Sequence, residues 1–177
     1  SERGYGAAMQ RGLRDLEDFM APDDVVVFLD GDYSDHPDEL PSLVAPLREG
    51  RADLVIGSRV LGRRERGALP LQCRFGNLLA CRLMRLIWGV RSTDLGPFRA
   101  LTWSRLQALR MTDRSFGWTI EMQIKAARKG WRIVEVPVSY RRRIGQSKIS
   151  GTYVGACKAG WGILSTIARH AWRRADV

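Results

Sequence analysis

The stretch VVVFLDGDYSDHPDEL, residues 25–40, joins an apolar run to a cluster of carboxylates and decides the fold class of this chain. Val25 to Leu29 has the composition of a strand buried on both faces. Asp30 and Asp32 follow it directly, separated only by Gly31. Two carboxylates this close repel each other, and a divalent cation relieves that repulsion. The stretch therefore predicts either a metal site or a solvated acidic turn at the end of a buried strand.

Helical and apolar segments alternate along the rest of the chain. Periodic apolar positions and turn residues predict helices at residues 7–20, 37–48, 74–88, 102–109, 119–129 and 152–174. Apolar runs predict further strands at residues 53–56, shortly after Gly96, and within 131–143. This alternation is typical of an α/β fold in which helices cover both faces of a parallel sheet. Pro137 has no amide hydrogen to donate, so it indicates an edge position for the last strand.

The polar residues that follow two of these strands belong at one edge of the sheet. Asp30 and Asp32 end the first strand, and Ser58 and Arg59 end the next. Ligands of parallel α/β sheets gather at the carboxyl ends of the strands. The sequence therefore predicts a carboxylate pair and an arginine on the same rim.

Composition indicates one basic domain with anionic partners. The chain has 177 residues, with 29 Lys and Arg against 19 Asp and Glu and a net charge of +10. Most of these cations are arginines, which suit phosphate and anionic surfaces, so nucleic acid, anionic lipid and nucleotide substrates all remain open on charge alone. Cys73, Cys81 and Cys157 lack metal-ligand spacing and predict reduced, mostly buried thiols. No apolar run approaches the ~20 residues that span a bilayer.

Eight segments, in order, carry a resemblance to a known family. They are GYGAAMQRGL, FLDGDYSDHPDEL, ADLVIGSRV, RFGNLL, TDLGPFRAL, FGWTIEMQIKAARKG, IVEVPVSYRRR and GQSKISG. Together they resemble the family 2 glycosyltransferases, in particular the dolichyl-phosphate mannose and glucose synthase-like branch. The resemblance implies the GT-A fold, a Rossmann-like mixed and mainly parallel sheet. It also implies that the family's first strand–helix–strand, a unit of ~30 residues or more, lies before Ser1, which makes this chain N-terminally truncated.

The resemblance gives the acidic pair a role in donor binding. It implies that Asp30 and Asp32 bind Mn²⁺ or Mg²⁺ on the diphosphate of a nucleotide sugar, with Asp30 also on the sugar or ribose side. Ser34 stands where relatives often carry Gln as a further metal contact, which leaves the third ligand open.

Three arginines match family positions that neutralise phosphates. They are Arg59, Arg74 and Arg142. Arginine stays charged and offers several donors to phosphoryl oxygens, which agrees with this role. Arg74 could instead extend along its helix, and either Arg141 or Arg143 could take the place of Arg142.

The remaining matched positions concern the acceptor. Asp94 matches an acidic position beside the acceptor, and Glu121 lies near the place of a catalytic base, which an alcohol acceptor needs and a phosphate does not. Glu121 could equally be satisfied by local amides, and Trp118 beside it could stack on a sugar or belong to the core. Ser147 and Lys148 resemble a phosphate-contacting loop, with a surface turn as the alternative.

The sequence predicts an amphipathic helix at the end of the chain, and so a division into a glycosyltransferase domain at 1–151 and a terminal helix at 152–177. Its apolar face carries Tyr153, Cys157, Trp161, Leu164, Ala168 and Trp172, and Lys158, Arg169 and Arg173 lie opposite this face. Aromatic and basic residues on one helix indicate an interfacial helix on an anionic membrane. Packing on its own domain or on a dimer partner is the alternative.

These observations predict an inverting, metal-dependent glycosyltransferase. It moves a hexose from a UDP- or GDP-sugar to an acceptor, foremost a polyprenyl phosphate at the cytoplasmic face of a membrane. The alternative is a non-catalytic, membrane-associated fragment that keeps the fold. A nucleic-acid-binding module is disfavoured, because the basic residues lie beside carboxylates and no nucleic-acid motif is present.

Overall fold

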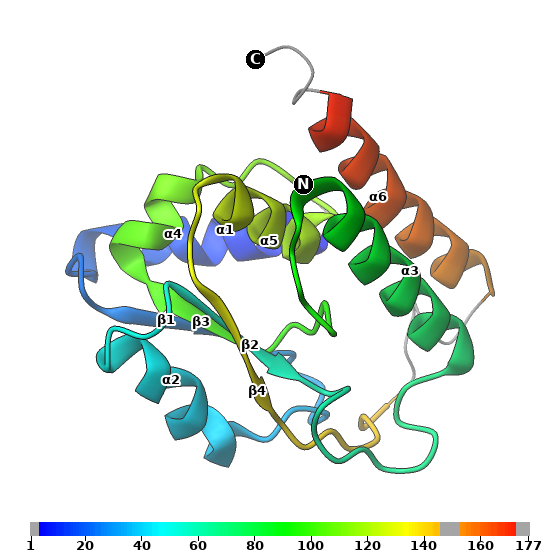
Figure 1. Cartoon of the computed structure of the whole chain (residues 1–177). Helices are drawn as coiled ribbons and strands as arrows, with labels where there is room; N and C mark the ends of the chain where they lie inside the picture. The colour runs from blue at the N-terminus through cyan, green and yellow to red at the C-terminus, as the bar shows by residue number, and fades with distance from the viewer. Residues whose placement is uncertain (1–3, 146–152, 173–177) are drawn as a thin grey trace.

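The computed structural model describes residues 4–145 and 153–172, and within them four strands form one mixed sheet (Figure 1). The strands are β1 (Val25–Phe28), β2 (Leu54–Ser58), β3 (Arg99–Thr102) and β4 (Ile133–Pro137), in the order β1-β3-β2-β4. β3 pairs antiparallel with β1 and with β2, whereas β2 and β4 are parallel. Three strands therefore point one way, and β4 lies at an edge, as Pro137 predicted.

Helices cover both faces of this sheet. They are α1 (Tyr5–Leu16), α2 (Leu40–Arg48), α3 (Leu71–Trp88), α4 (Trp103–Leu109), α5 (Trp118–Arg128) and α6 (Tyr153–Trp172), with short 3₁₀ turns η1 (Glu17–Phe19) and η2 (Pro37–Glu39). Figure 1 shows α2 on one face and α1, α4 and α5 on the other, while α3 and α6 run side by side along one flank. The predicted elements are confirmed to within a few residues at each end.

Each face of the sheet has its own apolar core. Phe28 and Ile56 pack with Trp118 and Met122 on the side of α5, and Leu43 of α2 packs with other strand residues on the opposite side. Every residue of β2 is buried, which agrees with a strand covered on both faces. β1 forms the other edge of the described sheet, and its residues alternate between buried and partly buried, so one of its faces is less completely covered than the other.

A third core cluster joins α3, α5 and α6. Met84, Ile120 and Ile167 are buried in it, one from each helix. α6 therefore packs against the body of the protein through its inner side. Cys81 also belongs to this cluster, and Cys73 is a half-buried free thiol. None of the helices in the described ranges is long and apolar enough to cross a membrane.

Candidate active site

A cleft of about 440 Å³ opens where the sheet's carboxyl edge meets α3 and α6. Its charged end is lined by Asp30, Arg59, Tyr140 and Arg143. Its other walls come from the loop before α3 and from the inner sides of the two helices, with Leu69, Cys73, Gly76, Leu95, Gly160 and Ile163 among them. The prediction that the carboxylate that ends β1 and the arginine that ends β2 share a rim is confirmed.

Asp30 lies in an electrostatically crowded position. Its side chain is half-buried, and the hydroxyl of Tyr5 lies 3.5 Å from its Oδ1. Burial and the neighbouring charge of Asp32 raise the pKa of Asp30, and Arg143 and Arg59 act against this rise. The site disfavours the charged form of one of two adjacent carboxylates, so a bound cation would stabilise both in their charged form.

Asp32 is held in place by a tight turn. Its Oδ1 accepts hydrogen bonds from the backbone N–H of Ser34, at 3.0 Å, and from the Ser34 hydroxyl. Its Oδ2 lies 3.1 Å from Nη2 of Arg143. Tyr33, between Asp32 and Ser34 in the sequence, has a φ of 71°, which lies in the left-handed region that a residue with a bulky side chain rarely adopts. Strain of this kind concentrates at functional sites.

Asp35 stabilises this turn through a buried hydrogen bond. It is 1% exposed, and its Oδ2 accepts a hydrogen bond of 3.0 Å from the backbone N–H of Asp30. Burial raises the pKa of Asp35 to about 6, against the lowering effect of that hydrogen bond. Within the described ranges, no group of three or more His, Cys, Asp or Glu side chains could hold a metal ion. A cation at Asp30 and Asp32 would therefore need further oxygen ligands from a diphosphate or from water, which suits hard divalent ions.

Arg59 is locked by a buried, two-point ion pair. Its Nε and Nη2 donate to the two carboxylate oxygens of Asp94 at 2.8 and 2.7 Å, and its backbone N–H donates to the same carboxylate at 2.8 Å. Asp94 is completely buried. Burial disfavours the charged guanidinium, but Asp94 outweighs it and holds the pKa of Arg59 above its ordinary value. Asp94 thus positions Arg59, and both of its oxygens are engaged in doing so.

The loop that carries Asp94 is clamped from three directions. Asn77 of α3 donates to the carbonyl of Thr93, Gln123 of α5 donates to the carbonyl of Asp94, and Glu135 of β4 accepts from the N–H groups of both loop residues. Burial raises the pKa of Glu135, while these hydrogen bonds act against the rise. Sequence reasoning missed all three clamping residues. Only Glu135 left a signal, as one acidic residue within an apolar strand.

Gly96 allows the loop to approach the end of β2. A Cβ at this position would lie 3.1 Å from the carbonyl oxygen of Gly57 and 3.2 Å from Nε of Arg59. Such contacts are tighter than packed atoms tolerate without a shift. A glycine here is therefore part of how Arg59 and Asp94 meet.

The three consecutive arginines after β4 point to different partners. Arg141 lies over the ring of Tyr33. Arg142 donates to the backbone carbonyl of Arg66 at 2.8 and 2.6 Å, away from the cleft. Arg143 lines the cleft and pairs with an acidic residue of the turn. The structure therefore brings Arg143, and not the predicted Arg142, to the charged end of the cleft.

Three other predicted phosphate contacts are not among the described residues that line the cleft. Arg74 is exposed on α3, on a helical turn whose neighbours Cys73 and Gly76 line the cleft. Ser147 and Lys148 lie outside the residues that the structure describes. Phosphate binding by these three residues stays a prediction.

Glu121 is a structural carboxylate in this geometry. It is 1% exposed, and it accepts hydrogen bonds from the N–H and hydroxyl of Thr112 and from the N–H of Asp113, and Lys125 pairs with it at 2.7 Å. Burial would raise the pKa of Glu121, yet these partners lower it. It does not line the cleft. The geometry agrees with the alternative in which local amides satisfy this residue.

Trp118, the first residue of α5, belongs to the core. It is 1% exposed, and its ring lies edge-on to Phe28 with 6.4 Å between ring centroids. A sugar could not stack on a ring that is covered in this way. Between its two interpretations, the structure supports the core.

The chain belongs to glycosyl transferase family 2, whose model matches residues 1–110. It is 35% identical over 156 residues to an uncharacterised glycosyltransferase of Mycobacterium tuberculosis, covering 86% of this chain and 67% of that protein. It is 33% identical over 148 residues to the undecaprenyl-phosphate mannosyltransferase of Micrococcus luteus, covering 79% of this chain and 60% of that protein. A dolichyl-phosphate hexose transferase of Haloferax volcanii is 32% identical, with 87% of this chain and 64% of that protein covered.

Solved structures share the fold. A glucosyl-3-phosphoglycerate synthase of Mycobacterium tuberculosis, in complex with phosphoglyceric acid, superposes with a TM-score of 0.70 at 20% identity, over 97% of this chain and 56% of that one. The same synthase in complex with Mn²⁺, UDP-glucose and phosphoglyceric acid gives a TM-score of 0.65, over 96% and 55% of the two chains. The fold is thus that of the GT-A glycosyltransferases, and the chain spans just over half the length of these solved relatives.

Proposed function

We propose that this chain carries the active site of an inverting, metal-dependent glycosyltransferase that transfers a hexose from a UDP- or GDP-sugar to a polyprenyl phosphate. The observation that carries the proposal is the cleft with two unlike ends. One end gathers Asp30, Arg59 and Arg143. The other walls, from α3, α6 and the loop before α3, are mostly apolar and glycine residues, with Gln72 and Asn77 of α3 among them. Such a cleft suits a ligand that joins phosphates to a hydrocarbon chain. The names of the relatives from Micrococcus and Haloferax support the same acceptor class.

The donor's diphosphate belongs at the charged end. Asp30 and Asp32 fit a hard divalent cation, Mn²⁺ or Mg²⁺, because their mutual repulsion favours one and their oxygens leave ligand positions for phosphate. When bound, such a cation neutralises charge on the leaving diphosphate. Asp32 pairs with Arg143 in this structure and would exchange that partner for the cation, which leaves the guanidinium beside it to hold phosphate oxygens. The bound synthase that shares the fold contains Mn²⁺ and UDP-glucose, which supports this assignment.

The acceptor needs little chemical activation in this scheme. A phosphate monoester is already an oxyanion, so it can attack the anomeric carbon opposite the leaving diphosphate without a general base. Among the described residues that line the cleft, Asp30 is the one carboxylate. Asp94 and Glu121 are both committed to buried partners. The absence of a free base at this described cleft therefore favours a phosphate acceptor over an alcohol.

We also propose that the reaction takes place at the cytoplasmic face of a membrane, with the protein bound peripherally. The hydrocarbon tail of a polyprenyl phosphate stays in the bilayer, because each CH₂ group moved into water costs about 0.8 kcal/mol. The phosphate must then be met at the membrane surface. No nucleic-acid partner is part of this proposal.

The proposal is tested by calorimetric binding of UDP-glucose and GDP-mannose, with and without Mn²⁺. We expect one donor to bind in a Mn²⁺-dependent manner to the unmodified chain, and Asp32→Asn to abolish that dependence because the cation loses a ligand. Asp38→Asn is the matched control, since the Asp38 side chain is 80% exposed and outside the cleft. Binding that ignores Mn²⁺ or survives in Asp32→Asn would contradict the metal site. Transfer to undecaprenyl phosphate then separates an enzyme from a non-catalytic fragment.

A further inference from the structure

α3 and α6 share a broad apolar outer surface. Both helices pack on α5 and on each other with their inner sides (Figure 1). On their outer sides, five large apolar residues are between 69% and 83% exposed. They are Leu71, Phe75, Leu86, Trp161 and Trp172. We call this surface the α3–α6 face.

The spacing of these residues places them in one stripe on each helix. Phe75 follows Leu71 by four positions, and Leu86 follows Phe75 by eleven; Trp172 follows Trp161 by eleven. Eleven residues are close to three helical turns at ~3.6 residues per turn, so each step returns to nearly the same side. Contiguous exposed apolar surface of this kind marks an interaction site.

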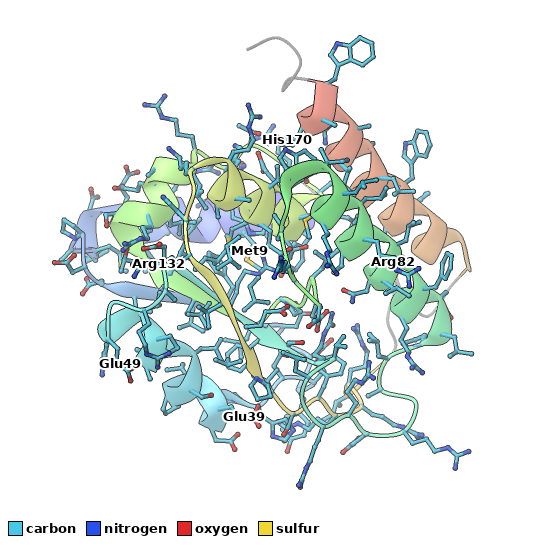
Figure 2. The ribbon with its side chains drawn as sticks, viewed as in Figure 1. Met9, Glu39, Glu49, Arg82, Arg132 and His170 are labelled. Atoms are coloured by element: carbon cyan, nitrogen blue, oxygen red, sulfur yellow. The ribbon has the colours of Figure 1, made fainter. Side chains whose placement is uncertain are left out.

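The charged residues of α3 and α6 are all positive. Neither the α3 sequence nor the α6 sequence contains Asp or Glu. Arg74, Arg82 and Arg85 are exposed on α3, and Lys158 is exposed on α6. Figure 2 labels Arg82 midway along α3. An occupant that complements this surface therefore offers both apolar and anionic groups.

We propose that the α3–α6 face is the docking surface for an anionic lipid bilayer. A second copy of the chain would be a poor occupant, because a two-fold interface would set these arginines against their own equivalents. A bilayer offers hydrocarbon for the apolar stripe, phosphate groups for the basic residues and an interfacial layer in which Trp rings are favoured. The sequence predicted a membrane role for the terminal helix only, and the structure adds α3 as an equal contributor.

This docking would place the cleft at the lipid surface. Gly76 and Gly160, which line the cleft, belong to the same two helices. The membrane contact itself does not depend on the proposed transferase reaction. It can therefore be tested without a donor or an acceptor.

The test is co-sedimentation of the 177-residue chain with vesicles of phosphatidylcholine alone or mixed with phosphatidylglycerol. We expect binding to the mixed vesicles that weakens as salt is raised. Phe75→Ser on α3 and Trp161→Ser on α6 should each weaken this binding about tenfold, since each removes a large apolar group from the contact. Phe19→Ser is the matched control, because Phe19 is 81% exposed on η1, away from both helices, and should bind as the unmodified chain does.

A charge reversal completes the design. Arg82→Glu should weaken binding to the mixed vesicles, whereas Arg48→Glu, on exposed α2 surface, should not. All five positions are exposed, and circular dichroism checks that each variant stays folded. Unchanged binding by Phe75→Ser would overturn the role of α3, and equal binding to neutral vesicles would overturn the charge argument.

A second copy of the chain would be the occupant if light scattering showed dimers that Phe75→Ser abolishes and the chain did not bind vesicles. Donor calorimetry is done without lipid, so failure of either proposal is distinguishable.

Discussion

Arg59 and Asp94 show how a buried ion pair fixes the orientation of a side chain at the proposed phosphate site. The two parallel hydrogen bonds fix the plane of the guanidinium, and the clamped loop fixes Asp94 in turn. Removing one partner of a buried ion pair leaves an uncompensated charge, at a cost of about 3–5 kcal/mol. Any loss of activity on substituting Asp94 would therefore mix lost stability with lost positioning of Arg59. Asp94 is for that reason unsuited as a test of base catalysis.

The neighbouring arginines Arg142 and Arg143 provide a cleaner test. Arg143→Ala should weaken binding of the Mn²⁺-dependent donor by about tenfold or more, because a hydrogen bond to a charged group contributes ~1.5–3 kcal/mol. Arg142→Ala should change it much less, since Arg142 donates to the carbonyl of Arg66 outside the cleft. The same calorimetry measures both variants. A larger effect of Arg142→Ala would restore the assignment made from the sequence.

Residues that follow strands could be predicted, and residues that act through long-range contacts could not. Asp30, Asp32 and Arg59 were found because strand ends share a rim. The choice among Arg141, Arg142 and Arg143 depends on the turn after β4, where Tyr140 forms backbone bridges both to the segment after β1 and to the loop before α3. No local pattern in a run of three identical residues encodes that register.

At the scale of elements, two glycines make room between α3 and α6. An ideal Cβ at Gly76 or Gly160 would meet no atom within 4 Å, although both residues line the cleft. A larger side chain at either position would therefore enter the cleft without disturbing the packing of the helices. These two positions therefore leave open space beside the cleft.

Gly160→Leu should thus weaken binding of the acceptor without lowering the stability of the fold. The melting temperature should stay equal or rise, because glycine is ~1 kcal/mol less favourable than the best residues inside a helix. KM for undecaprenyl phosphate should rise several-fold while donor affinity is unchanged. Gly12→Leu on α1, where a Cβ also meets no atom within 4 Å, is the control and should leave KM unaltered. A normal KM in Gly160→Leu would show that the acceptor tail does not use this wall.

The helices and strands themselves were predictable, but their order in the sheet was not. Apolar periodicity located α3 and α5 closely, and all-apolar runs located β1 and β2. The insertion of β3 between β1 and β2 was not foreseen. β3 is a four-residue strand that begins with the buried Arg99, whose guanidinium donates to backbone carbonyls, so its composition gave no sign of a central place.

At the scale of the whole molecule, Asp53 links three distant segments. It precedes β2 and binds Arg105 of α4, at 2.5 Å, and Arg132 before β4, at 3.1 Å. The hydrogen bonds from Arg132 lower the pKa of Asp53 to about 2, against the effect of burial. A carboxyl whose pKa is lower in the folded state stabilises the fold above its unfolded pKa of about 4, and this contribution is lost as pH falls towards 2.

Asp53→Asn should therefore lower the free energy of unfolding at pH 6 by about 1 kcal/mol. The expected loss is small because water screens the charges of the two arginine partners. The difference from the unmodified chain should shrink as the pH falls from 4 to 2. Urea unfolding at pH 6, 4 and 3 measures this. Asp38→Asn, at an exposed position, should show no such convergence. A stability gap that is constant with pH would mean that Asp53 acts through packing rather than through its charge.

The antiparallel strand β3 also has a consequence for charge separation. It sets β1 and β2 two strand spacings apart, or about 10 Å at ~4.8 Å for each spacing. Were the two strands adjacent, the carboxylates after one and the guanidinium after the other could collapse onto each other and cancel. β3 keeps the two strand ends apart, and the loop that leads into it brings Asp94, which forms an ion pair with Arg59. The carboxylates after β1 and the guanidinium after β2 thus stay apart, each with its own partner, at a separation that a bridging ligand can span.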